Sequence, residues 1–127
     1  KTAMRFEAGS PNTLGQVAMH ASIGLLQDVG MSRVESLIEE NSRVLSAGLE
    51  DISGVELLRP FDPQRVSGIV SFRPLNKNPA EILKALKQRK LSCALRRGAI
   101  RLSPHFYQAG KPVLEMLDLV EHVIRVK

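Results

Sequence analysis

Two arginines in one short segment carry the clearest chemistry in the sequence. Arg96 and Arg101 lie in the stretch LSCALRRGAIRLSPHFY, residues 91–107, whose apolar residues are typical of a β-hairpin. A guanidinium keeps its proton at physiological pH, and its planar fork binds a carboxylate or phosphate through two hydrogen bonds. Because a strand is a rigid support, either arginine could anchor an anionic group of a substrate. Exposure to solvent or a structural ion pair is the commoner role of a strand arginine, and residue type alone favours that role.

The other reactive side chains form no pattern typical of a catalytic or metal site. His20 and His122 fall on predicted helices, where we interpret them as solvent-facing residues. His105 follows a proline at the exit of a predicted strand, and a structural hydrogen bond is its simplest role. Cys93 lies among apolar residues and is interpreted as a packing thiol rather than a nucleophile. The sequence therefore predicts no metal site and no catalytic residue of its own.

The length of 127 residues predicts a single domain over residues 1–127 with an ordinary hydrophobic core. Its one cysteine has no partner for an internal disulfide, which suits a reducing compartment, and we expect a cytoplasmic protein. No apolar run approaches the length that spans a membrane, so no membrane partner is expected.

The charge is basic, at +5, from 18 Lys and Arg against 13 Asp and Glu. Such an excess permits a nucleic-acid-binding α+β module, which is the alternative from another class of function. Proteins that bind single strands stack bases on aromatic side chains, and the sequence has only four Phe, one Tyr and no Trp. We therefore expect no nucleic-acid partner, and a salt-sensitive gel shift with oligonucleotides would contradict this expectation.

Four helices and four short strands are predicted to position these residues. Apolar periodicity and capping residues predict helices at 13–29, 32–52, 79–90 and 112–126, and strands at 55–58, 68–73 and in two arms of a hairpin that turns near Arg97 and Gly98. This order favours an α+β fold, with a small and mostly antiparallel sheet of about four strands packed against helices.

Two segments of the sequence resemble one enzyme family. The stretches RFEAGSPN, residues 5–12, and ALRRGAIRLSPHFYQ, residues 94–108, are similar to the carboxy-terminal small domain of the class V aminotransferases. This family of pyridoxal-phosphate enzymes includes cysteine desulfurases, selenocysteine lyases, kynureninases and isopenicillin-epimerase-like proteins. The resemblance extends over nearly the whole chain. It implies the carboxy-terminal domain of a fold-type I enzyme, an amino-acid substrate and a homodimer.

The resemblance also implies roles for particular residues. Arg101 matches the arginine that holds the substrate α-carboxylate, and Arg96 matches a position that often carries arginine in cysteine desulfurases. Ser10 matches a hydroxyl residue that contacts the cofactor phosphate, in many members the phosphate of the neighbouring subunit. Without the resemblance, Ser10 would simply help to turn the chain into the first helix.

Departures from the family pattern narrow the expected reaction. Cysteine desulfurases carry a reactive cysteine on a loop between the two hairpin strands, and residues 96–99 leave no room for such a loop. Cys93 precedes the turn and does not match that cysteine. An aminotransferase-like enzyme is therefore favoured, with a cysteine desulfurase, a selenocysteine lyase or an epimerase of the same family as alternatives.

The sequence contains no Ser/Thr-x-His-Lys context for the Schiff-base lysine that binds pyridoxal phosphate. We expect that lysine in a large domain outside this sequence, and we expect that these 127 residues alone do not bind the cofactor. A stand-alone regulatory or dimerisation module is the remaining alternative, and the sequence of the parent protein would decide between the two.

Overall fold

The computed structural model describes residues 2, 6, 9–65, 67–108 and 110–126. The chain divides into two compact units, Lys1–Val34 and Glu35–Lys127, which are described one at a time. The single domain over 1–127 stays a prediction. Among the described residues, no helix combines the length and the apolar character that crossing a membrane requires.

The first unit contains helix α1 (Thr13–Val29), with the predicted bounds. The helix begins there because the Asn12 side chain accepts a hydrogen bond from the Gly15 N–H at 2.9 Å. It ends at Gly30, where a φ of 87° favours glycine. The carbonyl of Gly30 then accepts from Val34, so helix α2 (Met31–Glu50) begins at Met31. The predicted bounds of this helix, 32–52, were therefore wrong by one residue at the start and by two at the end.

The second unit is built on an antiparallel sheet in the order β1-β2-β4-β3. The strands are β1 (Val55–Leu57), β2 (Val70–Pro74), β3 (Ala94–Arg96) and β4 (Ala99–Leu102). Helices α3 (Pro79–Gln88) and α4 (Lys111–Arg125) and a short 3-10 helix, η2 (Phe106–Gln108), complete the unit. The predicted α+β architecture with a small antiparallel sheet of four strands is therefore confirmed.

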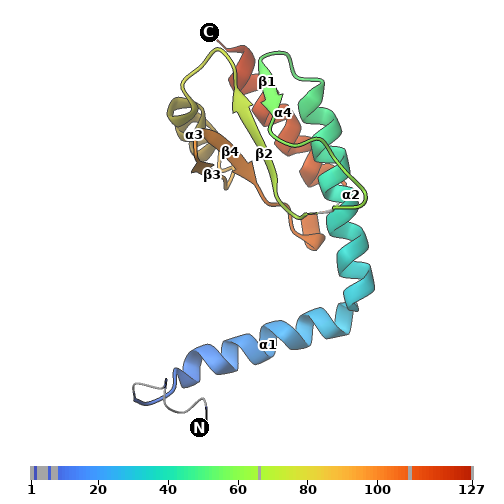
Figure 1. Cartoon of the computed structure of the whole chain (residues 1–127), viewed down its shortest axis with the longest axis vertical. Helices are drawn as coiled ribbons and strands as arrows, with labels where there is room; N and C mark the ends of the chain where they lie inside the picture. Colours follow the sequence, from blue (N-terminus) through green and yellow to red (C-terminus); the bar gives the residue numbers. More distant parts are fainter. Residues whose placement is uncertain (1, 3–5, 7–8, 66, 109, 127) are drawn as a thin grey trace. The chain divides into compact units, whose positions relative to one another are not determined.

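The core lies on one face of this sheet. Side chains alternate along β2 and β4, so Phe72 and its cross-strand partner Ile100 are fully buried while Ser71 and Arg101 point to the other face. Helices α2, α3 and α4 cover the buried face, and in Figure 1 the strands stand in front of α4. The helices contribute mainly Leu45, Leu49, Ile82, Leu86, Val113 and Val120. The opposite face carries polar and charged side chains.

The ends of α3 and α4 are held by specific hydrogen bonds. Asn78 caps α3, with Pro79 at the first helical position, as the sequence predicts. At its other end, Lys90 adopts a φ of 64°, and the Leu91 N–H donates to the Leu86 carbonyl at 3.1 Å. This is a Schellman ending in which a lysine occupies the position that glycine usually takes.

Candidate functional site

A tight hairpin positions the two arginines. Strands β3 and β4 pair so that Arg96 lies opposite Ala99, which leaves Arg97 and Gly98 as the turn. Both turn residues have positive φ, 50° and 78°, as the two-residue type I′ hairpin requires. The predicted turn is therefore confirmed, and the hairpin has no inserted loop.

Arg101 lies at the centre of the sheet, on the face that the helices leave uncovered. Its strand is flanked on both sides, with Ser71 of β2 and Ala94 of β3 directly opposite it. Across the part of the chain that the structure describes, no acidic side chain lies within ion-pair distance of Arg101. On the same face, Arg73 is paired with Glu56 at 2.7 Å. Arg101 therefore keeps its guanidinium available for an external anion.

The Arg101 side chain borders a hollow of about 430 Å³ at the end of the sheet. Three segments line the hollow beside β4. They are residues 90–91 after α3, residues 92–93 before β3, and residues 103–104 after β4. The main polar members of the hollow are Lys90, Ser92, Ser103, Tyr107 and Gln108. Two cations, Arg101 and Lys90, border it, and none of its described lining residues is acidic. The hollow is thus suited to a carboxylate or another small anion.

Arg96 shares the sheet face of Arg101 but lies outside this hollow. Diagonal positions on an antiparallel pair are about 7 to 8 Å apart, and the register makes these arginines diagonal neighbours. The Arg96 side chain is exposed, and its Nη1 donates to the Leu95 carbonyl at 3.2 Å. The structure therefore separates the two predicted anion-binding residues into one that borders a cavity and one that does not.

Backbone hydrogen bonds fix the segment that follows β4. The His105 carbonyl accepts from Nδ2 of Asn41, which is 1% exposed, at 2.9 Å. The His105 N–H donates to Oε1 of Gln108, also at 2.9 Å. The imidazole stacks on Tyr107, with ring centroids 4.8 Å apart. His105 thus has a structural position that shapes the rim of the hollow, where Tyr107 and Gln108 lie.

The other two histidines lie on helices. His20 and His122 are exposed on α1 and α4, which agrees with their interpretation as solvent-facing residues. Within the described ranges, no group of three or more His, Cys, Asp or Glu side chains is arranged to hold a metal ion.

Ser10, the predicted phosphate contact, belongs to the first unit. It is exposed and lies two residues before Asn12, the cap of α1. The backbone N–H groups at the start of a long helix favour a phosphate nearby. Arg5, Glu7 and Ala8 of the same sequence motif lie outside the described residues. Ser10 belongs to the Lys1–Val34 unit, whereas the Arg101 hollow belongs to the Glu35–Lys127 unit.

Cys93 borders the hollow but packs partly against the core. Burial raises the pKa of its thiol, and the nearby Lys87 ammonium lowers that pKa by a smaller amount. The Sγ atom lies 3.7 Å from the Leu91 carbonyl, in the geometry of a weak thiol hydrogen bond. Cys93 is therefore a protonated, half-buried thiol near neutral pH, as the packing interpretation predicts.

The raised pKa of Cys93 predicts a pH dependence. A thiol whose pKa is higher in the folded state stabilises the fold below its unfolded pKa of about 8.5, and this stabilisation is lost as pH rises through the folded value. We expect the stability difference between the native sequence and a Cys93→Ala variant to shrink above that pH in urea titrations. Ellman's reagent should also react more slowly with the folded chain than with the chain unfolded in urea. Equal rates would contradict the burial of this thiol.

Comparison with known proteins identifies the family. The family model for class-V aminotransferases matches residues 1–126. The chain belongs to the class-V aminotransferase family. The resemblance found in the sequence is thereby confirmed.

The relatives of this class-V chain include proteins named as cysteine desulfurases and a protein named as an aminotransferase. The chain is 26% identical to a probable cysteine desulfurase of Methanothermobacter thermautotrophicus, over 94% of this chain and 34% of that protein. It is 25% identical to a probable cysteine desulfurase of Pyrococcus abyssi, over 95% of this chain and 33% of the relative. It is 27% identical to YcbU, an uncharacterized aminotransferase of Bacillus subtilis, over 93% of this chain and 31% of that protein. The chain thus spans about a third of the length of these relatives.

The fold of this class-V chain matches a solved structure. A mutant of C-DES with glycine covalently linked to its PLP cofactor superposes with a TM-score of 0.83, at 21% identity, over 92% of this chain and 31% of that one. At this identity the match shows the fold alone, and it agrees with the predicted α+β architecture.

Proposed function

We propose that this chain is the carboxy-terminal, substrate-binding small domain of a pyridoxal-phosphate enzyme that acts on an amino acid. The observation that carries the proposal is Arg101, a central-strand arginine that borders a cationic hollow and has no acidic partner among the described residues. A substrate α-carboxylate would supply the missing negative charge. Family membership supports this assignment, because the resemblance to class-V aminotransferases implies an amino-acid substrate.

The residues of this chain would bind and orient the substrate. The Arg101 fork would donate hydrogen bonds to both carboxylate oxygens, and Lys90, which also borders the hollow, would strengthen the positive field. Tyr107, which is 73% exposed beside the hollow, could cover the bound group and keep water from it. When bound, pyridoxal phosphate supplies the electron sink that stabilises negative charge at the substrate α-carbon. In this proposal the lysine that moves the proton belongs to a large domain outside the sequence.

Ser10 fits the cofactor phosphate in its chemistry. Its hydroxyl is exposed, can donate a hydrogen bond, and precedes a helix whose first turn contains no acidic residue. We propose that this hydroxyl contacts the phosphate of a neighbouring subunit in a homodimer. The single cysteine of the chain is the ground for placing the whole enzyme in the cytoplasm.

Cysteine desulfurase is the second candidate reaction. Two of the relatives above are named probable cysteine desulfurases, which favours it. The tight turn at Arg97 and Gly98 favours an aminotransferase-like reaction instead, because it has no loop that could carry a reactive cysteine. The two candidates share the proposed Arg101 anchor and differ in the group that the substrate loses, which is the α-amino group in transamination and the side-chain sulfur in desulfuration.

The test uses the full-length protein. The assay contains pyridoxal phosphate, a panel of amino acids, an acceptor keto acid and a thiol reductant. An aminotransferase converts the amino acid to its keto acid and passes the amino group to the acceptor, whereas a desulfurase converts cysteine to alanine and the thiol reduces the released sulfur to sulfide. Absorbance of bound cofactor is expected in the full-length protein and not in the 127 residues alone. Stoichiometric cofactor binding by the 127 residues, or no turnover of any amino acid by the full-length protein, would contradict the proposal.

Lys90 borders the hollow but was not singled out from the sequence. Its replacement by glycine should improve stability and weaken substrate binding. Lys90→Gly should stabilise the 127-residue chain by about 1 kcal/mol, because glycine adopts positive φ without the steric cost of a Cβ. In the full-length enzyme the same change should raise the KM for the amino acid, since it removes a cation from the hollow. The measurements are urea unfolding and steady-state kinetics.

The matched control is Lys84→Gly inside α3. Lys84 is exposed and lies outside the hollow, so glycine there should cost about 1 kcal/mol of stability and leave KM unchanged. A loss of stability in Lys90→Gly would contradict this prediction. It would mean that the lysine side chain stabilises the fold by more than the steric cost of its positive φ.

A further inference from the structure

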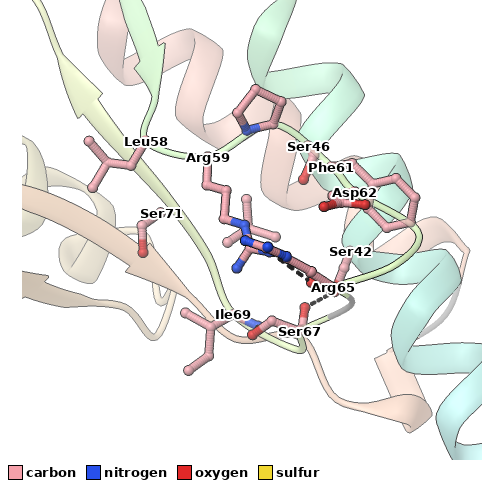
Figure 2. Close-up of a pocket in the computed structure, with 12 residues that line it drawn as sticks. Ser42, Ser46, Leu58, Arg59, Phe61, Asp62, Arg65, Ser67, Ile69 and Ser71 are labelled. Atoms are coloured by element: carbon pink, nitrogen blue, oxygen red, sulfur yellow. Dashed lines mark hydrogen bonds between the residues drawn. The ribbon is translucent and has the colours of Figure 1, made fainter.

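A second cavity, of about 310 Å³, lies in the Glu35–Lys127 unit, and it shares no lining residue with the Arg101 hollow. Its walls are α2, the connection between β1 and β2, and the start of β2. Figure 2 shows Ser42 and Ser46 of α2 facing the connection that carries Arg59, Asp62 and Arg65. The volume is at the lower end of the range for small-molecule sites.

One polar group in this cavity has no partner within the described residues. Ser46 is 4% exposed, and no described residue hydrogen-bonds its hydroxyl. Its neighbour one turn earlier, Ser42, donates to the Ser67 carbonyl at 2.8 Å and is satisfied. No side-chain oxygen or nitrogen of the described residues is both buried and without a hydrogen-bond partner, so the Ser46 oxygen keeps accessible surface. Because Ser46 lines the cavity, its hydroxyl can donate to a ligand that occupies the cavity.

The charges around the cavity are mainly positive. Arg59 reaches across it and donates one N–H to the Arg65 carbonyl at 3.3 Å, which leaves the other guanidinium donors free (Figure 2). Across the described residues, neither Arg59 nor Arg65 forms an ion pair. Asp62 is the one acidic residue among the described residues that line the cavity, and its Oδ1 accepts a hydrogen bond from the Gln64 N–H at 2.9 Å. Two cations therefore face one carboxylate that is already engaged.

The rest of the wall is apolar. Leu58, Phe61 and Ile69 line the cavity beside the arginines, and Ile69 is 47% exposed. A bare inorganic anion would leave this surface in contact with water. A small molecule with an anionic end and an apolar body would use both kinds of wall.

We propose that this cavity is a binding site for a small organic anion, a phosphate ester or a carboxylate, separate from the amino-acid site. The guanidinium groups of Arg59 and Arg65 bind the anionic group, Ser46 donates a hydrogen bond to it, and the apolar wall covers the body of the ligand. The site does not depend on the proposed enzymatic function, because none of its residues borders the Arg101 hollow.

The test titrates the chain with phenyl phosphate, phenylacetate and the neutral analogue benzyl alcohol, followed by calorimetry and backbone amide shifts. We expect saturable binding of at least one anion, weaker binding of benzyl alcohol, and shifts at Ser42, Ser46 and Ile69. Whichever anion binds more tightly assigns the ligand class. The Arg101→Leu variant should bind equally well, which separates this site from the hollow.

Two substitutions decide the mechanism. Arg65→Gln should weaken anion binding about tenfold, and Ser46→Ala about fivefold, as expected for the loss of one charged and one neutral hydrogen-bond partner. The matched controls are Arg33→Gln and Ser53→Ala, both exposed residues outside the cavity, which should leave the affinity unchanged. Circular dichroism checks that each variant is folded. No saturable binding of either anion, equal binding of benzyl alcohol, or affinity unaffected by both cavity substitutions would overturn the proposal.

Discussion

Replacing Arg101 by leucine in the full-length protein should raise the KM for the amino-acid substrate by about tenfold to a hundredfold. A hydrogen bond to a charged group contributes about 1.5 to 3 kcal/mol, which corresponds to this range. The effect should be large because no other arginine of the described residues borders the hollow and strands β2 and β3 hold Arg101 from both sides. Steady-state kinetics over a wide substrate range measure it.

Two further variants make this result specific. Arg101→Lys keeps the charge but loses the planar fork, so its KM should lie between those of the native enzyme and Arg101→Leu. Arg125→Leu removes an exposed arginine paired with Glu121 on α4, and its kinetics should match the native enzyme. Native kinetics in Arg101→Leu would remove this residue from the substrate site, whatever reaction the enzyme catalyses.

Replacing Phe72 by alanine should destabilise the chain by about 3 to 5 kcal/mol, as measured for large core side chains. Phe72 is fully buried, and β1 and β4 flank its strand. The neighbouring residue on the same strand, Ser71, lies directly opposite Arg101. Loss of the ring should therefore loosen the strand that supports Arg101 as well as the core. Urea unfolding followed by circular dichroism gives the free energy.

The control for Phe72→Ala is Leu114→Ala on α4. Leu114 is 53% exposed, so its truncation should change the free energy of unfolding by less than about 0.5 kcal/mol. Phe72→Leu should fall between the two, because it keeps most of the apolar contact. A cost below 1 kcal/mol for Phe72→Ala, on the scale of a surface change, would contradict the central place of this ring in the core.

Local signals in the sequence were sufficient for most of the secondary structure. The sequence offers Asn12 or Thr13 as the cap of the first helix and Asn78 as the cap of the third, and Asn12 and Asn78 are the caps in the structure, because a short polar side chain can replace a missing backbone partner. The hairpin turn was also predictable, since Gly98 allows the positive φ that a two-residue turn requires. These features depend on neighbours within a few residues, which the sequence displays directly.

Features that depend on distant residues were not predictable in the same way. Lys90 resembled one more cation at a helix end, and only the Schellman geometry brings it to the rim of the hollow. The start of α2 was misplaced because Gly30 ends one helix and begins the next. The Ser46 cavity was missed altogether, since its walls come from segments that are separated in the sequence. The apolar pattern of α1 predicts a helix but does not reveal what would cover it, and none of its residues is buried.

The number of residues in strand β4 decides which side chains face the core. Ile100 and Leu102 fill the core while Arg101, between them, faces the opposite side. Because side chains alternate strictly along a strand, one inserted residue would turn the guanidinium into the core and expose an aliphatic chain in its place. If Arg101 binds the substrate as proposed, substrate preference around this strand can therefore change by exchange of residues, in evolution or in directed selection, but not by a change in the number of residues between the turn and Ser103.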